Sequence, residues 1–321
     1  MLVDAKDRCK KRKGRDDMKL FRGRNASTVV PAVHEIVEEL ADYLPMTVRQ
    51  LYYQLVAREI IPNRHSEYRN ISNVLTKMRR ENLLSWDTIE DRSRRLIDKR
   101  GETDLEAHIA EYSEHLFRYY NRCLVQNQDR YVEIFTEKDA LSSIVSEACW
   151  QYCVRVVVSR GQISTTFVRE YSERAMAAIA KGQIPTILYI GDLDPSGLRI
   201  PSTIVETLST YHGVSVDLQR IALTIEQIQE HNVPANPDAV KTQDPNYRWF
   251  RDQGFTVAAE VDALHPAVLR QTIQDALRRV LDLEDMEQQE RIQDRERATL
   301  MRLKRMFTKD CAELGISYQP T

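Results

Sequence analysis

The clearest pattern along the chain is a set of three short apolar runs separated by stretches with helical spacing. The runs lie within residues 131–138, 154–158 and 186–191. Consecutive apolar residues favour strands that are buried on both faces of a parallel sheet. Alternation of strand and helix predicts a sheet with right-handed crossovers. We therefore expect an α/β domain, a parallel sheet flanked by helices, over residues 130–265.

Apolar residues at helical spacing also predict helices on both sides of this domain. The expected elements are helices over residues 30–44, from Thr47 and over 67–82, a hairpin or wing over 84–90 and 92–95, a helical linker over 101–129, and a helical extension over 266–321. Three helices and a wing predict an α+β winged-helix domain over residues 29–100, in which the third helix enters a DNA groove. The highly charged second part of the extension is expected to be exposed or to face a second protomer.

Charge separates the two halves of the chain. The 321 residues carry a net charge of −2, which by itself gives no sign of nucleic-acid binding. Residues 1–100 contain 22 basic and 15 acidic residues, a net charge of +7, whereas the remainder contains 24 and 33, a net charge of −9. Positive charge therefore gathers on the expected DNA-binding part. Residues 1–28 are expected to be a disordered basic arm that adds salt-sensitive affinity for phosphates.

Cysteine usage and hydropathy indicate the compartment. The five cysteines form no Cys-x-x-Cys pair, which favours a reducing cytosol and argues against a zinc ribbon. Neither a signal peptide nor an apolar run of membrane-spanning length is visible in the sequence. We expect a cytoplasmic, nucleoid-associated protein without a membrane partner.

Two of the apolar runs end on carboxylates. Glu137 ends the first, and Gly191 ends the third and is followed by Asp192 and Asp194. Such residues project into the crevice where open α/β sheets bind ligands. Neighbouring carboxylates repel unless one is protonated or a cation binds, and hard oxygen ligands select Mg²⁺. The pattern predicts a Mg²⁺ site, and the alternative is a solvated turn whose aspartates cap the next helix.

These motifs carry a family resemblance. Glu137-Lys138, the Gly-containing loop after the second run, and residues 192–197 (DLDPSG) together resemble the Toprim domain of topoisomerases, bacterial primases and some nucleases. The Asp-x-Asp-Pro-x-Gly variant is similar to that of topoisomerase VI A subunits and their meiotic double-strand-break relatives. The length of the chain resembles that of the stand-alone mini-A proteins of phages and mobile elements.

A tyrosine motif extends the resemblance to the N-terminal part. Residues 47–58 read TVRQLYYQLVAR, which resembles the Arg-Asp/Glu-x-Tyr-Tyr motif of topoisomerase VI A subunits. Carried over by position, the nucleophile is Tyr53 and the supporting cation is Arg49, one helical turn away. Gln50 stands where the family has an acid. The alternative is that the two tyrosines only pack within a helix.

The resemblance implies a homodimeric enzyme that cleaves double-stranded DNA by Mg²⁺-assisted transesterification, as type IIB topoisomerases do. Tyr53 would attack a phosphate with help from Arg49, while Glu137, Asp192 and Asp194 hold the metal. In the family, the tyrosine of one protomer works with the metal of the other. No Gly-rich ATP-binding loop is visible, so an ATPase would have to come from a separate B-type subunit.

The sequence also offers candidate DNA-contacting residues, a further acidic residue and two alternative functions. The candidate DNA contacts are Arg69, Lys77, Arg79, Arg80 and Arg160. Glu260 lies in a segment that resembles the end of topoisomerase VI A subunits, and a structural role is favoured for it. One alternative function is a hydrolytic Toprim nuclease of a defence or mobile-element system, in which Tyr53 only packs. Another is a DNA-binding regulator without catalysis.

Overall fold

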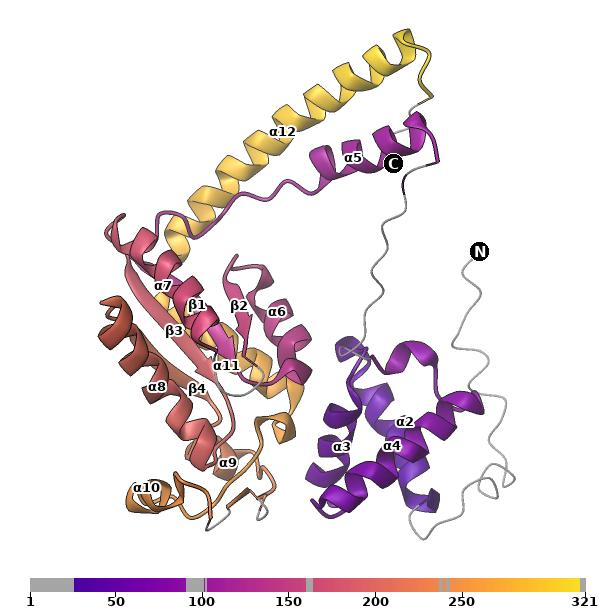
Figure 1. Ribbon diagram of the computed structural model, residues 1–321. Helices are drawn as coiled ribbons and strands as arrows, with labels where there is room; N and C mark the ends of the chain where they lie inside the picture. The colour runs from indigo at the N-terminus through magenta and orange to yellow at the C-terminus, as the bar shows by residue number, and fades with distance from the viewer. Residues whose placement is uncertain are drawn as a thin grey trace.

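The chain folds into a helical N-terminal part, an α/β domain and a two-helix arm (Figure 1). The computed structural model describes residues 26–90, 101, 103–159, 164–236, 239–240 and 243–317. Most of the expected basic arm and Arg160 lie outside the described residues. Residues 26–28, expected at the end of that arm, instead begin the first described helix.

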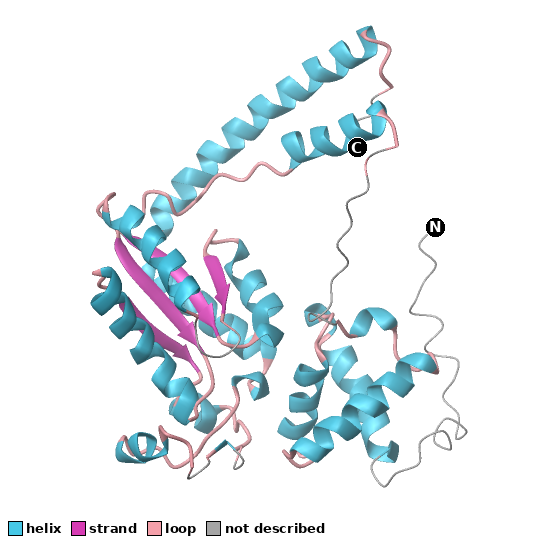
Figure 2. Ribbon diagram, viewed as in Figure 1, coloured by secondary structure: helices cyan, strands magenta, loops and turns pink. Residues whose placement is uncertain are grey.

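The α/β domain is built on a parallel sheet, as predicted (Figure 2). Its strands are β1 (Arg130–Thr136), β2 (Arg155–Val158), β3 (Ile184–Ile190) and β4 (Asp217–Ala222). The spatial order is β2-β1-β3-β4, and all three pairings are parallel. In the sheet, β2 lies on one side of β1 and β3 lies on the other, so the chain crosses over β1 between β2 and β3. The carboxyl ends of β1 and β3 therefore form the topological switch point where open α/β sheets bind ligands.

Helices cover both faces of this sheet. They are α6 (Ser142–Trp150), α7 (Thr165–Ile179), α8 (Pro195–His212) and α11 (Pro266–Val280). Alternate residues of a strand point to opposite faces, so Phe135 packs in the cluster that contains residues of α7 and α8, whereas Ile134 packs in the cluster that contains residues of α6 and α11. The second cluster continues into the N-terminal helices, which ties the two parts together through apolar contacts.

The N-terminal part contains the three expected helices. They are α2 (Ala26–Glu39), α3 (Val48–Ala57) and α4 (His65–Arg80), with short 3-10 turns η2 (Ala41–Tyr43) and η3 (Trp86–Thr88). Residues 84–90, the first part of the hairpin or wing expected over 84–90 and 92–95, form no strand. The Ser85 side chain caps η3 there, and a single bridge joins Ile89 to Met46. Residues 92–95 lie outside the described part of the chain, so the winged-helix assignment stays a prediction.

The arm pairs two helices from distant parts of the sequence. α5 (Leu105–Arg118) lies beside α12 (Leu283–Glu313) (Figure 1). The helical extension expected over residues 266–321 contains two helices, because Asp282 caps the start of α12 and Gln128 binds both backbone groups of Asp282. Among the described residues, no helix is both long and apolar enough to span a membrane.

Candidate functional site

Carboxylates gather where β1 and β3 end. β1 delivers Glu137 and Lys138, and β3 delivers Gly191 and Asp192. A Cβ atom on Gly191 would lie 2.7 Å from the Tyr189 ring, and one on Gly197 would lie 2.5 Å from the Asp192 carbonyl oxygen. Both positions therefore require glycine for close packing rather than for a special backbone angle. The tight turn between them fixes where Asp192 and Asp194 emerge.

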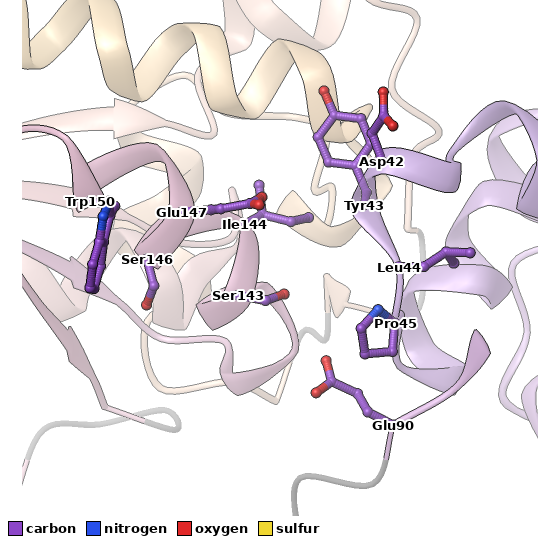
Figure 3. A pocket seen from close by; sticks show the side chains of 10 residues that line it. All are labelled: Asp42, Tyr43, Leu44, Pro45, Glu90, Ser143, Ile144, Ser146, Glu147 and Trp150. Atoms are coloured by element: carbon purple, nitrogen blue, oxygen red, sulfur yellow. The ribbon is translucent and has the colours of Figure 1, made fainter. Parts of the chain in front are cut away.

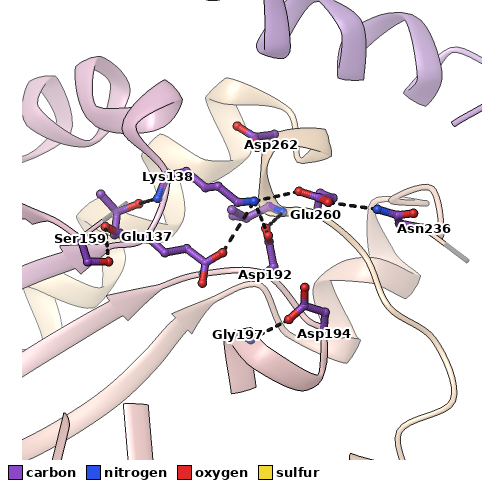
Figure 4. Close-up of polar contacts among 12 residues, drawn as sticks. Glu137, Lys138, Ser159, Asp192, Asp194, Gly197, Asn236, Glu260 and Asp262 are labelled. Carbon is purple, nitrogen blue, oxygen red and sulfur yellow. Dashed lines mark hydrogen bonds and ion pairs between the residues drawn. The ribbon is translucent and has the colours of Figure 1, made fainter. Parts of the chain in front are cut away.

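Asp192 is buried and binds a cation of the chain itself. Its Oδ1 accepts a hydrogen bond from the Val261 amide at 2.9 Å, and its Oδ2 forms an ion pair with Lys138 Nζ. The same ammonium lies 2.9 Å from Glu260 Oε2 and 3.7 Å from Glu137 Oε1 (Figure 4). Lys138 thus supplies the positive charge that the carboxylate spacing requires. The sequence motif contained this residue, but its role was not predicted.

Asp194 has a different environment from Asp192. Its Oδ1 accepts a hydrogen bond from the Gly197 amide at 2.6 Å and caps the N-terminus of α8. The capping alternative therefore describes this aspartate, which is half-buried: burial raises its pKa, and the Glu137 and Glu260 carboxylates raise it further. Asp194 lies at the edge of the carboxylate group, with one oxygen engaged in the cap (Figure 4).

A third segment completes the group. Leu193 and Ala259 exchange two backbone hydrogen bonds of 3.0 Å, which bring the 3-10 turn η6 (Val261–Ala263) and its flanks to the end of β3. Glu260 thereby reaches Lys138, and its other oxygen accepts a hydrogen bond from Asn236 at 3.0 Å. Glu260 is part of the site rather than a remote structural residue. Asp262, two positions later, was not predicted, yet the pair repeats the acid-x-acid spacing of residues 192 and 194.

Arg49 links this group to the N-terminal part. Its Nε donates a hydrogen bond to Asp262 Oδ2 at 2.8 Å, and its terminal nitrogen pairs with Glu260 Oε2. The other oxygen of Asp262 is buried and has no hydrogen-bond partner among the residues that the structure describes. Unpaired buried carboxylate oxygens are uncommon and costly, so Asp262 has capacity for a further donor or cation.

The pKa values of the buried carboxyl groups are set by burial and by the charges of their neighbours. Burial opposes ionisation of Glu260, but Lys138 and Arg49 outweigh it and lower the pKa of Glu260 to about 2. Burial raises the pKa of Asp192 well above its usual range, Lys138 opposes that rise, and Glu137 adds to it. The described site combines the carboxyl groups of residues 137, 192, 194, 260 and 262 with two cations, Lys138 and Arg49. It therefore carries an excess of acids.

Buried polar residues hold the frame of the site. The Arg220 guanidinium donates hydrogen bonds to the carbonyl oxygens of Gly191, Asp192, Gly197 and Leu223 at 2.6–3.2 Å. The Tyr189 hydroxyl donates to Glu137 Oε2 at 3.1 Å. These contacts fix the turn after β3 and the orientation of Glu137. Their positions within β4 and next to the last residue of β3 gave no sequence signal for this role.

The two tyrosines of α3 have different surroundings. The Tyr52 hydroxyl accepts a hydrogen bond from the Arg64 amide at 2.9 Å and donates within the turn before α4. The Tyr53 hydroxyl has no hydrogen bond to another described residue, and the Arg49 guanidinium carbon lies 5.5 Å from its ring centroid. Burial raises the pKa of Tyr53, the Glu260 carboxylate raises it further, and Arg49 opposes that rise. Tyr52 therefore stabilises the turn before α4, whereas the charges of Glu260 and Arg49 act on the hydroxyl of Tyr53.

Gln50, where the resembled motif has an acid, has a local role. Its side-chain oxygen accepts a hydrogen bond from the Thr47 amide at 2.7 Å, and its own amide donates to the Thr47 hydroxyl at 3.2 Å. This reciprocal capping box fixes the start of α3. An amide serves the box as well as a carboxylate, so the substitution keeps the helix that presents Arg49 and Tyr53.

The candidate DNA contacts on α4 divide into two kinds. Arg69 and Arg80 are exposed, whereas Lys77 and Arg79 are half-buried. The Arg79 guanidinium carbon lies 5.3 Å from the Trp86 ring centroid, so part of this side chain packs against η3. Arg69 and Arg80 therefore present the positive surface of α4 most openly.

A pocket lies between the N-terminal part and α6, away from these residues (Figure 3). Its volume is about 340 Å³, and Asp42, Glu90 and Glu147 contribute carboxylates to its wall. None of the candidate site residues lines it. Carboxylates repel phosphates, so the pocket is not a candidate for the DNA surface.

The donor chemistry of the site suits Mg²⁺, but the side chains are not arranged as a ready-made metal site. Within the described ranges, no group of three or more His, Cys, Asp or Glu side chains is placed to hold a metal ion. The Lys138 ammonium lies among the carboxylates in the position that such an ion would need. The hard oxygen donors of the group, including the Asp262 oxygen that has no hydrogen bond to a described residue, fit Mg²⁺ by their chemistry.

Lys138→Met should destabilise the protein without metal by about 3 kcal/mol, because it leaves buried carboxylates without their cation. Urea unfolding in the presence of a chelator measures this loss. Added Mg²⁺ should recover part of it. The matched control is Lys181→Met at an exposed turn, which should change the unfolding free energy by less than about 0.5 kcal/mol. An equally small effect of Lys138→Met would contradict the assigned role.

Comparison of the chain with protein-family models, curated proteins and solved structures found no match. The functional assignment therefore depends on the geometry of the site and on the motifs.

Proposed function

We propose that this protein cleaves double-stranded DNA by Mg²⁺-dependent tyrosine transesterification, as topoisomerase VI A subunits do. One observation carries the proposal: on α3, Arg49 lies against the Tyr53 ring and joins the two parts by binding Glu260 and Asp262, which belong to the same acidic group as Glu137 and Asp192. A nucleophile, a cation and an acidic group from three distant parts of the sequence then share one location. A packing role for Tyr53 alone does not account for this convergence.

The covalent step needs only groups that this proposal names. The Tyr53 oxygen attacks a DNA phosphorus, a tyrosine–phosphate bond forms, and the bond from phosphorus to a deoxyribose oxygen breaks. The phenol proton must leave and the departing sugar oxygen must gain one. Because burial and nearby carboxylates raise the pKa of Tyr53, the phenol is protonated before DNA binds. Glu260 and Asp262 are the carboxylates whose charges act on Tyr53, and we propose that one of them takes the phenol proton, while water supplies the proton to the departing sugar oxygen.

Glu137, Asp192 and Asp194 are the residues that would hold Mg²⁺, with Asp262 as a further donor. When bound, the ion would stabilise negative charge on the phosphate. Arg220 and Tyr189 position the turn and Glu137 for this purpose. Arg49, whose side chain is 39% exposed, can turn a donor toward a phosphate while it still contacts Asp262.

The spatial relation of Tyr53 to the acidic group bears on how protomers cooperate. The family resemblance implies that a tyrosine works with the metal of the partner. Here Arg49 binds acids of its own chain. We infer a resting arrangement in which α3 lies against its own acidic group. Binding of DNA between two protomers would have to release this contact before a partner's metal could be used.

The positive N-terminal part is the proposed DNA surface. Arg69→Ala and Arg80→Ala, on the exposed side of α4, should each weaken duplex binding and reduce the slope of log K against log salt by about 1, because each removes one phosphate contact. Fluorescence anisotropy over a salt series measures both. Arg291→Ala, at a side chain of α12 that is 74% exposed, serves as the control and should leave the slope unchanged. Equal slopes for all three variants would place the DNA surface elsewhere.

A hydrolytic nuclease is the second candidate function. The raised pKa of Tyr53 favours it, because a protonated phenol is a poor nucleophile. In that case water attacks the phosphate, and Tyr53 only packs against Arg49. Strand passage would in either case need energy from a separate B-type ATPase subunit, since the sequence contains no Gly-rich nucleotide loop.

Incubation with supercoiled plasmid and Mg²⁺, followed by denaturation, tests the proposal. Transesterification leaves protein covalently attached to the cut ends, and hydrolysis leaves ends free of protein. Omission of Mg²⁺ should prevent both.

A further inference from the structure

The long helix α12 changes the sign of its charge along its length. Residues 283–294 contain five acidic residues and one basic residue, a net charge of −4, whereas residues 295–309 contain six basic residues and one acidic residue, a net charge of +5. The chain after residue 100 is acidic as a whole, with a net charge of −9. Residues 295–309, the distal half of α12, are therefore a local positive region that the candidate site does not use.

Four basic residues of the distal half form one stripe. Arg295, Arg302, Arg305 and Lys309 are all exposed, and they follow one another at intervals of seven, three and four residues. At about 100° per residue, these intervals place them within a sector of about 80° of the helix. We call these four residues the basic stripe. It extends over about 21 Å of helix, because each residue adds about 1.5 Å.

The basic stripe faces away from α5, which lies beside α12 (Figure 1). The side of α12 toward α5 contains the buried Gln293 and Phe307, whose ring centroid lies 5.8 Å from that of Phe117. Helical geometry places the basic stripe on the opposite side of α12. The one acid of the distal half, Glu296, also faces α5 and pairs with Arg122 at 2.8 Å. The stripe therefore has no carboxylate of the distal half beside it.

Three members of the stripe keep their charge available. Among the residues that the structure describes, no ion pair joins Arg295, Arg302 or Arg305 to a carboxylate, whereas Lys309 lies 3.5 Å from Glu313. A cation without a counter-ion in the protein can neutralise a bound anion at full charge. The three arginines are therefore the core of an anion-binding surface, and Lys309 extends it.

This surface is remote from the acidic group. Gln128, which precedes β1, binds the backbone of Asp282 at the start of α12. α12 therefore leaves the α/β domain at the amino ends of the strands, whereas the acidic group lies at their carboxyl ends (Figure 1). At ~1.5 Å per residue, Arg295 lies about 18 Å along α12 and Arg305 about 33 Å. The stripe is thus separate from the place where Tyr53 and Arg49 meet the carboxylates.

We propose that the basic stripe is a second binding surface for the phosphate backbone of duplex DNA, in addition to α4. Each strand of a duplex presents a phosphate every ~3.4 Å along its axis, so the ~15 Å between Arg295 and Arg305 covers about four phosphates. Guanidinium groups match the geometry of phosphates. The choice of DNA rests on the proposed function, whereas binding at the stripe does not require cleavage.

An anionic membrane fits this surface less well than DNA does. A helix that lies on a membrane buries a continuous apolar face and keeps its cations at the border of that face. On α12 the centre of the exposed side is cationic, and the exposed apolar residues Met301 and Leu303 lie on its two flanks. Cations at the centre of a face suit a row of phosphates.

Fluorescence anisotropy of the full chain with a labelled duplex tests this proposal. The duplex has about 40 base pairs, roughly 140 Å at ~3.4 Å each, and a chelator prevents cleavage. Arg295→Ala/Arg302→Ala/Arg305→Ala should reduce the slope of log K against log salt by about 2.7, because each lost phosphate contact removes ~0.9. The corresponding triple lysine variant keeps the charges and should keep the slope. Far-UV circular dichroism should show unchanged helix content, since alanine favours helices.

The matched control is Arg169→Ala/Arg278→Ala/Arg291→Ala. It removes the same charge from three exposed side chains, each of which is paired with a carboxylate one helical turn away. This variant should bind the duplex with the slope of the wild type. A stripe-alanine variant with the wild-type slope would overturn the proposal, and so would a lysine variant that loses as much slope as the alanine variant.

Two further outcomes separate this proposal from its alternatives. If vesicles of anionic lipid bind the wild type but not the stripe-alanine variant, while the duplex slopes stay equal, the partner is a membrane and the proposal fails. A reduced slope in the alanine variant of a protein that never cuts DNA would support the stripe and reject only the cleavage. Wild-type cleavage with equal slopes would reject only the stripe.

Discussion

Tyr53→Phe is expected to abolish DNA cleavage and, with it, every covalent protein–DNA adduct. Transesterification needs the phenol oxygen, whereas a metal-bound water would still hydrolyse DNA without it. The fold should tolerate the change, because the Tyr53 hydroxyl makes no hydrogen bond to another described residue and its ring contacts remain. Plasmid cleavage and adduct formation by the variant, compared with its urea unfolding curve, separate a chemical effect from a structural one.

Tyr52→Phe is the matched control for this result. It removes a hydroxyl that exchanges hydrogen bonds with the backbone of Arg64 and contacts Asn63. The unfolding free energy should fall by about 1–2 kcal/mol, while cleavage and adduct formation persist. The two variants therefore predict opposite patterns. A Tyr53→Phe protein that still cuts DNA and leaves protein-free ends would establish the hydrolytic alternative.

Asp192→Asn is expected to produce the second large loss. The amide oxygen can still accept the hydrogen bond from the Val261 amide, but the negative charge that would bind Mg²⁺ is gone. We expect cleavage to fall by at least ~100-fold, as when an electrostatic group is removed from an active site. Stabilisation by Mg²⁺, about 2.7 kcal/mol at 100 times the dissociation constant, should also be lost, and thermal unfolding with and without Mg²⁺ measures it.

Asp217→Asn provides the comparison for Asp192→Asn. Asp217 lies at the first residue of β4, the opposite end of the sheet, and pairs with Arg130 at its surface. Its replacement removes the same charge from the same domain and should leave both cleavage and the Mg²⁺ effect intact. Wild-type cleavage by the Asp192→Asn protein would show that the carboxylates at the strand ends do not hold the catalytic metal.

The sequence predicted those parts of the fold that depend on local pattern. The three apolar runs predicted β1, β2 and β3, and the alternation of strands and helices along the chain predicted a parallel sheet. The positions of Glu137 and Asp192 followed from strand ends alone. Within the expected wing, residues 84–90 form a 3-10 turn instead of a strand, because the Ser85 side chain caps Trp86–Thr88.

The rest of the site depends on contacts between distant segments. Asp262 and Lys138 are 124 positions apart in the numbering, and the backbone pairing of Leu193 with Ala259 helps to bring their segments together. Mutual repulsion of Asp192 and Asp194 was expected without metal, yet Lys138 relieves the charge of the first and a helix cap engages the second. An internal cation of this kind leaves no periodic signal in the sequence.

The most direct test of the central claim is to identify the atom that is joined to DNA. The wild-type protein is incubated with duplex DNA and Mg²⁺ and denatured, the DNA is digested to a nucleotide remnant, and the modified peptide is sequenced by mass spectrometry. Transesterification by Tyr53 predicts a phosphotyrosyl nucleotide on this residue, absent without Mg²⁺ and absent from the Asp192→Asn protein. DNA that is cut while the peptide containing Tyr52 and Tyr53 stays unmodified would contradict it.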